Sequence, residues 1–438
     1  MKKLIVTSIA TSMILFAANV DGLDMDQENR VQDSKINAAI IMQGKTEIWG
    51  EADVTGLTVK SKDRGNIIEH SIINGAANLD FQSNEFMNSE YYDRELDDSI
   101  VTQGRTKVIN GKVNNVSIDS DSVINDETTI NAATGNSVTI DQGFTLVDGY
   151  GQELTDAHIK SDNRISNVDI EGESVGSTTI RQANFKMINE GAASSAKNIN
   201  IDSTNVIEGG KIGHAIIKQA STELKNGAIA ENFDLVQENI ISGDTEIKEF
   251  SEVSQGVIKV DNSKISSLEQ SVQNIISDVQ GDSSSAVDSK IVQSEIDVQN
   301  NSDLSLTQLA HTNIIRSSEL VDSTITQDTI LVTDNSVVQN FTQEADSLVH
   351  HVEAENSEIL QNAMVVINST IDSRNASTSK QNNIVSDTDL TDARVGQAMV
   401  YVKDSQVMDL MVSEENVVTD SSLHNAYVTQ GELLISSL

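Results

Sequence analysis

The chain contains no cysteine and no proline among its 438 residues. Without cysteine there are no disulfide bonds, so a secreted form would be held together by packing and hydrogen bonds alone. An average chain of this length holds about twenty prolines. Because proline removes a donor from a β-ladder, its absence favours a structure in which nearly every segment is hydrogen-bonded on both sides.

Aromatic and basic residues are also scarce. Phe, Trp and Tyr make up 3% of the chain, and 29 Lys and Arg stand against 67 Asp and Glu, which gives a net charge of −38. Such a surface repels phosphates, so we expect no nucleic-acid partner. Such a charge is typical of a solvated surface. Calcium binding is the alternative, and it would be weak because no EF-hand loop is present. We expect no dedicated cofactor or metal site.

What the chain does contain is a repeated phrase, clearest at Ser99-Ile-Val-Thr-Gln-Gly. The copies align on a glutamine, with Ile or Val two residues before it and an apolar residue five after it. The residue that follows the glutamine is small or is Asn or Asp, as a tight corner between two strands requires. The aligned positions are Gln43, Gln103, Gln142, Gln182, Gln219, Val260, Gln293, Gln327, Gln361, Gln397 and Gln430.

We interpret this column as an inward-facing amide ladder between stacked copies. In the same register, Ile180 faces the interior and Asp141 faces solvent. Asparagines three residues before an inward aliphatic would turn corners in the left-handed conformation and would stack into a second ladder. They are Asn115, Asn198, Asn232, Asn356 and Asn425.

The spacing of the copies indicates the architecture. From Gln103 onward the steps are 33 to 41 residues, which is long for one small β-coil. A second phrase falls halfway, with inward candidates six residues apart: Ile118 and Ile124, Ile159 and Ile165, Ile201 and Ile207, Leu235 and Ile241, Leu309 and Ile315, Val412 and Val418. We therefore predict an all-β, elongated β-solenoid of about 19 coils, with roughly 16–21 residues per coil, in a rod about 90 Å long.

The N-terminal part divides into two segments. Residues 1–22 resemble a secretory signal, with two lysines followed by a short apolar run, and no later run is long enough to span a bilayer. Residues 23–97 are less regular and are interpreted as a cap or tip, and residues 98–438 as the solenoid. The aromatic residues of the tip form a candidate partner surface: Trp49, Phe81, Phe86, Tyr91 and Tyr92.

The last copy of the phrase, Ala426 to Ile435, leaves little chain to cover the final coil. A bare strand edge offers unpaired backbone groups to another strand. A head-to-tail contact that does not close produces a filament. We therefore expect self-association into filaments.

The recurring Ser-x-x-x-Gln-Gly phrase at 99–104 is similar in logic to the curlin repeat, and the chain resembles the group of bacterial secreted β-solenoids that form fibres or act as adhesins. The resemblance covers the repeat region and implies an adhesive or matrix function at the cell surface or outside the cell. It makes a secreted structural fibre the first hypothesis. An adhesin or carbohydrate-binding rod, with a cell-surface or polysaccharide partner, is the second.

An enzyme is the least favoured reading. The sequence has no His-Glu-x-x-His, no Gly-x-Ser-x-Gly, no P-loop and no dinucleotide fingerprint. Carboxylates are so frequent that no pair stands out as a glycosidase dyad. Some β-helices degrade polysaccharides, so this activity remains the third alternative, and we predict no catalytic residues.

Overall fold

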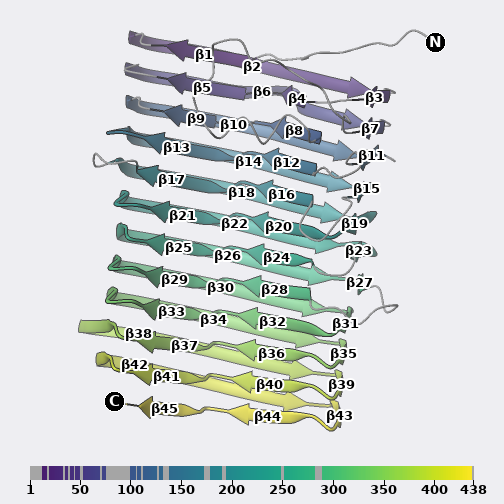
Figure 1. Cartoon of the computed structure of the whole chain (residues 1–438), viewed down its shortest axis with the longest axis vertical. Coiled ribbons are helices and arrows are strands. Elements are labelled where there is room, and N and C mark those ends of the chain that lie inside the picture. The colour runs from purple at the N-terminus through teal and green to yellow at the C-terminus, as the bar shows by residue number, and fades with distance from the viewer. Residues whose placement is uncertain are drawn as a thin grey trace.

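The computed structural model describes residues 99–436 except 105, 110–111, 126–127, 132–137, 172–177, 190–193, 248–250 and 282–288, and it describes the strands between residues 12 and 74. All of the described regular structure is β-strand, arranged as a β-solenoid. Figure 1 shows the strands stacked in parallel along one axis, with the two ends of the chain at opposite ends of the stack. The predicted solenoid class is confirmed.

Each coil contributes one strand to each of four parallel sheets, which we call sheets A to D. Along the chain the order is D, A, B, C and then D of the next coil, as in β8, β9, β10 and β11. Sheet D carries the glutamine phrase. Its strands are β4 Ile40–Gln43, β8 Ser99–Gln103, β12 Val138–Gln142, β16 Thr178–Gln182, β20 Ala215–Gln219, β24 Glu252–Gln255, β28 Ser289–Gln293, β32 Ser323–Gln327, β36 Glu358–Gln361, β40 Arg394–Gln397 and β44 Tyr427–Gln430.

Sheet A follows sheet D after a sharp corner. In every coil described from residue 99 on, the residue after the glutamine has a positive φ, from 63° at Gly104 through 54° at Asp328 to 64° at Gly431. The strands of sheet A are β1 Ser12–Phe16, β5 Lys45–Trp49, β9 Thr106–Ile109, β13 Thr145–Gly149, β17 Phe185–Asn189, β21 Thr222–Lys225, β25 Ile258–Asp261, β29 Ile296–Gln299, β33 Ile330–Thr333, β37 Met364–Ile367, β41 Val400–Lys403 and β45 Leu433–Ser436.

Sheet B contains the long strands, mostly of 14 residues, which form the back of the solenoid. A left-handed residue near the start of most of them, such as Asn115 with φ 55°, interrupts the alternation of inward and outward side chains. The strands are β2 Asn19–Gln32, β6 Asp53–Glu69, β10 Lys112–Asn125, β14 Glu153–Ser166, β18 Ser195–Glu208, β22 Ile229–Ser242, β26 Lys264–Ser277, β30 Asp303–Arg316, β34 Val337–His350, β38 Thr370–Ser386 and β42 Gln406–Thr419.

Sheet C is the short side that returns the chain to sheet D. Its strands have three or four residues and present mainly aliphatic side chains to the interior. They are β3 Lys35–Asn37, β7 Ile72–Asn74, β11 Thr128–Asn131, β15 Val168–Glu171, β19 Lys211–Gly213, β23 Thr245–Ile247, β27 Val279–Gly281, β31 Glu319–Val321, β35 Glu353–Glu355, β39 Asp389–Thr391 and β43 Ser422–His424.

The predicted count of about 19 coils is wrong. The halfway phrase is not a second coil but the long strand on the opposite side of the same coil. Ile118, for example, lies in β10 and pairs with Ile159 of β14, a full repeat away. The sheets contain 11 or 12 strands, so at about 4.8 Å per strand the stack is about 50 Å long instead of about 90 Å.

The repeat is already present N-terminal to residue 98. Strands β2 to β7 pair in the same four sheets as those that follow, with Val54 of β6 opposite Val113 of β10. Residues 23–97, where we expected irregular structure, therefore contain regular strands. Ser12–Phe16 forms β1, which pairs with β5, so the segment interpreted as a removable signal includes a strand of sheet A.

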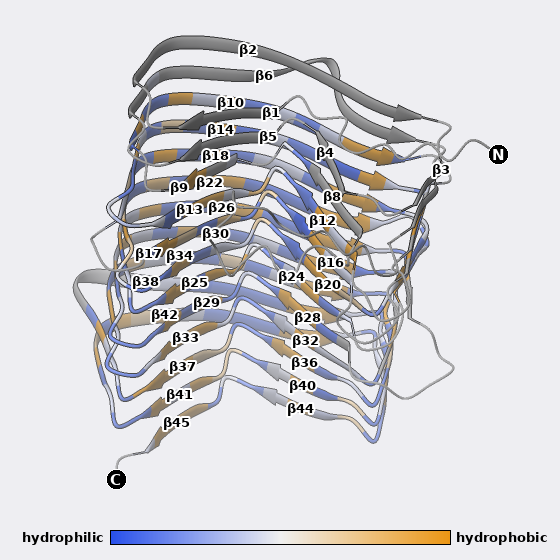
Figure 2. Ribbon diagram, turned by 45° about the horizontal axis from the view of Figure 1, so that its top comes forward, coloured by the Kyte–Doolittle hydropathy of each residue, from blue (hydrophilic) through white to orange (hydrophobic). Residues whose placement is uncertain are grey.

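The interior consists of two hydrophobic compartments. One lies between sheet A and the first half of sheet B and includes Val147, Phe185 and Ile201. The other lies between sheets C and D and the second half of sheet B and includes Ile140 and Ile207. Figure 2 shows the corner between sheets D and A bent inward, which divides the cross-section. The polar side chains of the repeat gather at this constriction.

Candidate functional site

The first polar element at the constriction is the glutamine ladder. Each Nε2 donates to the Oε1 of the preceding coil's glutamine at 2.7–2.9 Å, from Gln142 onto Gln103 through to Gln430 onto Gln397. In most of these glutamines the amide nitrogen also donates to a backbone carbonyl of sheet B, as Gln219 does to Asn205 O, 3.2 Å away. These contacts satisfy amides that would otherwise be costly to bury.

Gln255 occupies the position that we had given to Val260. Gln255 Nε2 donates to Gln219 Oε1 at 2.7 Å, and β24 pairs with β20 and β28 in the register of the other glutamines. Val260 instead lies in β25, buried between Leu224 and Val298 of the same column in sheet A. The structure also places Gln43 of β4 opposite Gln103, at the start of the column.

The sequence analysis missed a second interior ladder, which is formed by asparagines. Its Nδ2 atoms donate to the Oδ1 of the following coil at 2.7–2.9 Å, opposite in direction to the glutamine ladder. The members are Asn163, Asn205, Asn239, Asn274, Asn313, Asn383 and Asn416. Each stands two residues before an inward aliphatic in sheet B, and this Asn-x-Ile pattern was the available signal.

Of the asparagines that we did predict, Asn115, Asn198 and Asn232 lie inside the long strands of sheet B, and Asn356 and Asn425 lie at the corner between sheets C and D. All five have φ between 51° and 56°. Several stack through their side chains. Asn232 Nδ2 donates to Asn198 Oδ1 at 2.8 Å, and Asn425 Nδ2 donates to Asp392 Oδ1 at 3.0 Å. The left-handed conformation is therefore confirmed at all five positions, but only Asn356 and Asn425 turn a corner between sheets. Asp156 and Asp392 take the same conformation at equivalent positions.

A buried cluster interrupts the asparagine ladder, because Ser347 takes the asparagine position in β34. Asp328, which follows Gln327, accepts from Asn313 Nδ2 at 2.5 Å and from Ser347 Oγ at 2.8 Å. Its other oxygen lies 2.6 Å from His311 Nδ1, and the side chains of His311 and Asp328 are both fully buried. The cluster joins two adjacent coils at the constriction.

The imidazole of His311 has an acceptor on both sides. Its Nε2 lies 3.1 Å from Gln270 Oε1, and Gln270 donates its own amide to Gly256 O at 3.2 Å, which fixes the oxygen toward the ring. Each ring nitrogen therefore faces a side-chain oxygen, Asp328 Oδ1 on one side and Gln270 Oε1 on the other. Although Ser, His and Asp meet here, Ser347 donates to the carboxylate and not to the imidazole. This is not the geometry of a nucleophilic triad.

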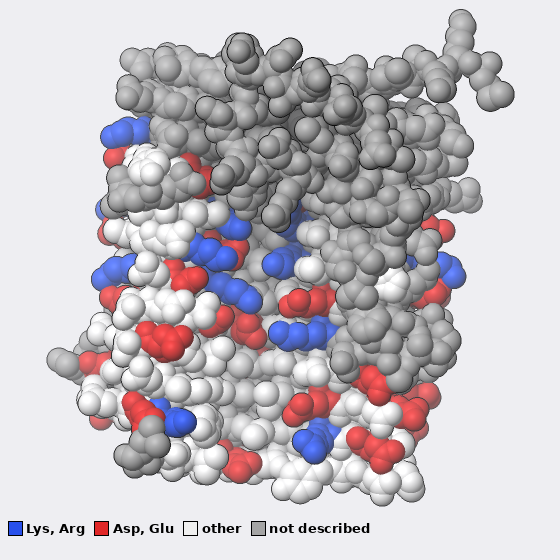
Figure 3. All heavy atoms as spheres, in the orientation of Figure 1, with Lys and Arg blue, Asp and Glu red and all other residues white. Residues whose placement is uncertain are grey.

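The outer face of sheets A and D forms a longitudinal groove, because the corner between them bends inward. Figure 3 shows this face with acidic and basic side chains intermixed along it. We had expected Asp141 to be solvated, but its side chain is 1% exposed and accepts from Arg181 at 2.6 and 3.0 Å. The guanidinium also lies 4.9 Å from the centroid of the Phe144 ring. An outward-facing side chain of sheet D, such as that of Asp141, can therefore be buried within this groove.

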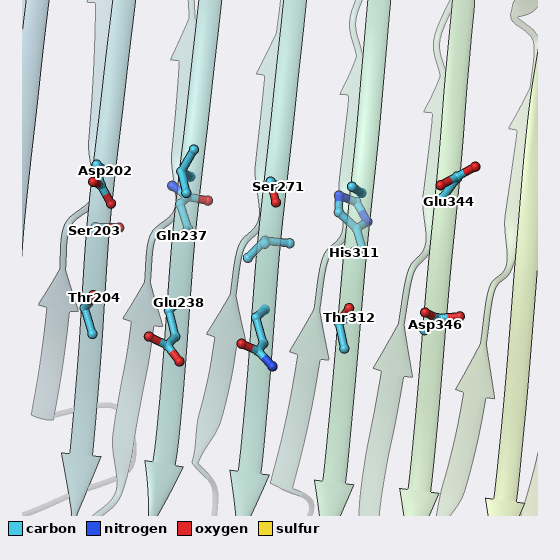
Figure 4. A pocket seen from close by; sticks show the side chains of 14 residues that line it. Asp202, Ser203, Thr204, Gln237, Glu238, Ser271, His311, Thr312, Glu344 and Asp346 are labelled. Carbon is cyan, nitrogen blue, oxygen red and sulfur yellow. The ribbon is translucent and has the colours of Figure 1, made fainter.

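A second depression lies on the outer face of sheet B. It has a volume of about 590 Å³ and crosses the strands from β18 to β34. Figure 4 shows its side chains, among them Asp202, Glu238, Glu344 and Asp346. In the part of the chain that the structure describes, no three His, Cys, Asp or Glu side chains gather closely enough to hold a metal ion. We therefore assign no metal site to this depression.

Acidic side chains stack in register on the same face nearer the N-terminus. Asp121 is opposite Asp162, and the pKa of Asp121 is raised above its usual 3.8, first by partial burial and then by the charges of Asp162 and Asp119. A raised folded-state pKa means that this carboxylate lowers stability as pH rises past 3.8. Like charges directly opposite each other on neighbouring strands are unfavourable.

We therefore expect Asp121→Asn to stabilise the protein at pH 7 by less than about 1 kcal/mol, since solvent screens part of the repulsion. The gain should be smaller at about pH 4 than at pH 7, because the raised pKa of wild-type Asp121 favours its protonated form as pH falls. Urea unfolding of both proteins at the two pH values measures the difference. A variant that is less stable than wild type at pH 7 would contradict the assignment.

The residues of the predicted tip remain untested. Trp49 is the last residue of β5, where its backbone pairs with Ile109. Phe81, Phe86, Tyr91 and Tyr92 lie outside the described residues. None of the described residues belongs to a helix that could cross a membrane. Comparison with protein-family models, with curated proteins and with solved structures finds no match for this chain.

Proposed function

We propose that this chain is a secreted structural protein that forms an extracellular or cell-surface fibre by end-to-end stacking of solenoids. The observation that carries the proposal is the uncovered face of strands β42 to β45, which presents the same four sheet edges on which the other described coils stack. Among the described strands, β42 to β45 have a neighbour on one side only. Their apolar side chains are uncovered, with Leu433 65% and Ile435 70% exposed. The equivalent side chains one coil earlier are much more covered: Val402, for example, is 8% exposed.

The amide ladder has a polarity that supports head-to-tail stacking. Every ladder glutamine from Gln142 to Gln430 donates toward the N-terminal end, so Gln430 donates to Gln397 and offers its own Oε1 outward. The first coil of a second copy would continue the ladder by donating to that oxygen. Because such a contact joins different surfaces of the two copies, it does not close on itself and leads to a filament.

The surface of the last coil gives a matched pair of variants. Ile435→Lys places a charge on the inward column, where the next copy would stack, and should abolish filaments. Leu434→Lys lies on the same strand, 52% exposed, and points to the opposite face, so filaments should remain. Negative-stain microscopy of the full chain, with and without calcium, makes the comparison.

Uniform short rods from the unmodified chain at high concentration would overturn the proposal. So would filaments that persist in the Ile435→Lys variant. The adhesin alternative predicts instead that single rods bind a surface ligand through residues 23–97, and deletion of that segment would abolish binding. We expect no polysaccharide-degrading activity, which assays on acidic glycans would reveal.

A further inference from the structure

Basic side chains gather in the middle of the groove between sheets A and D, although the chain as a whole carries a charge of −38. Arg181 of β16 and Lys218 of β20 are register partners on the wall formed by sheet D. Lys186 of β17 and Lys259 of β25 lie on the opposite wall, with Glu223 of β21 between them. All five line one cavity of about 110 Å³.

Lys218 is the cation without a partner in this cavity. Among the described residues its ammonium has no carboxylate within 4.0 Å and no hydrogen bond. Burial lowers the pKa of Lys218 below its usual 10.5. Lys259 and Arg181 lower the pKa further, while Glu223 and Glu252 oppose them. Lys218 therefore carries a half-buried positive charge that the neighbouring carboxylates of this chain stabilise only weakly.

Neutral donors line the same cavity. Asn184 is 5% exposed, and its Oδ1 accepts the backbone N–H of Ser221 at 2.9 Å, which leaves its NH₂ group toward the cavity. The hydroxyls of Ser221 and of Ser254, which is 7% exposed, also line it, and neither makes a hydrogen bond within the described chain. The amide nitrogen of Asn184 makes no hydrogen bond within the described chain, so it is available to the oxygen of a ligand in the cavity.

The carboxylates of the cavity are already engaged. Glu223 lies 3.4 Å from Lys186 and 2.5 Å from Lys225. These lysines lower the pKa of the Glu223 carboxyl against the opposing effect of its burial. Glu252 lies 4.0 Å from Lys290. The ammonium of Lys218 and the neutral donors therefore remain available to an acceptor. The ammonium favours an acceptor that carries negative charge, to which the neutral donors also bind more strongly.

We propose that this cavity is an oxyanion-binding site, which takes a sulfate, phosphate or carboxylate group between Lys218, Asn184 and the hydroxyls of Ser221 and Ser254. The volume of about 110 Å³ corresponds to three or four water molecules at about 30 Å³ each, which is enough for one such group. The groove is open along the axis of the solenoid, so the group is either a free ion or a substituent of a linear acidic polysaccharide. The proposal is independent of filament formation.

Titration calorimetry with sodium sulfate, against sodium chloride of equal ionic strength, tests the site. We expect the heat of a single binding site with sulfate and none with chloride. Lys218→Met keeps the aliphatic stem and removes the charge, and it should weaken sulfate binding at least tenfold. Lys112→Met is the control, because Lys112 is an exposed lysine of sheet B, 3.0 Å from Glu153, and should bind sulfate as wild type does.

A second variant tests whether the loss of sulfate binding comes from the missing donor or from a loss of structure. Asn184→Asp keeps an oxygen for the Ser221 N–H and replaces the amide donor with a carboxylate, so it should repel sulfate while circular dichroism stays that of wild type. Equal responses to sulfate and chloride, or sulfate binding unchanged in both Lys218→Met and Asn184→Asp, would overturn the proposal.

A third titration distinguishes the two sources of the anion. A uronic or sulfated oligosaccharide that binds more tightly than inorganic sulfate, and loses that affinity in Lys218→Met, would assign the site to a polysaccharide. Equal affinity per anionic group would assign it to a free ion.

Discussion

Replacing Asp328 with alanine is expected to lower the free energy of unfolding by about 3–5 kcal/mol, because it removes a buried carboxylate that three buried side chains contact. The substitution would leave the imidazole ring of His311 facing only Gln270, and would leave the amide of Asn313 and the hydroxyl of Ser347 without their acceptor. Because all of these groups are buried, water cannot replace the carboxylate. Urea unfolding followed by circular dichroism measures the loss.

Two further variants separate the buried charge from a general effect of the substitution. Asp346→Ala removes an exposed aspartate of β34 and should change stability by less than about 0.5 kcal/mol. Asp328→Asn should cost less than Asp328→Ala, because it keeps an acceptor oxygen. The following coil already has Asn362 at the equivalent position, in contact with Asn383. Equal stability of Asp328→Ala and Asp346→Ala would show that the cluster is not buried.

The second large effect is expected for Gln219→Leu, which should cost about 2–4 kcal/mol. The leucine fits a similar volume but removes the donor to Gln182 Oε1 at 2.8 Å and the acceptor of Gln255 Nε2 at 2.7 Å. The carbonyl of Asn205 loses its side-chain donor as well. Each buried polar group left without a partner costs about 1–3 kcal/mol.

Gln273→Leu is the matched control for the ladder. Gln273 lies on the outer face of β26 and is exposed, so the same chemical change there should leave the unfolding transition within about 0.5 kcal/mol of wild type. Native-state hydrogen exchange should place the weakening of Gln219→Leu in the neighbouring coils, because repeats interact mainly with their neighbours. A loss that is the same for both variants would argue against the interior ladder.

The repeat columns could be predicted from the sequence because each position has a constant environment. Ile140, Ile180 and Ile217 face the same compartment, so the same residue types recur there and reveal the register. The coil count could not be obtained in this way. Sheets B and D both alternate inward and outward side chains, and alternation does not tell whether two strands lie in one coil or in two.

The misplaced copy has a similar cause. Ile258-Lys-Val260 alternates as Val253-Ser-Gln255 does, and only the partner strands distinguish them. The pairing of His311 with Asp328 had no local signal, since the two residues lie in different sheets of adjacent coils. The cavity around Lys218 was also invisible, because it depends on the inward bend that brings sheets A and D together.

The central claim is that one repeat forms one coil, stacked in register on the next. Because the chain has no cysteine, an introduced pair would provide the only thiols. Thr312 and Asp346 are register partners on β30 and β34, and Asn382 lies one strand further on. The separation is about 4.8 Å across one strand and twice that across two, and only the first is within reach of a disulfide.

Mild oxidation of the two double variants, followed by mass spectrometry of peptides, therefore tests the account most directly. We predict a disulfide in Thr312→Cys with Asp346→Cys, and two free thiols in Thr312→Cys with Asn382→Cys. Free thiols in the first variant, as two coils per repeat would give, would contradict the structure.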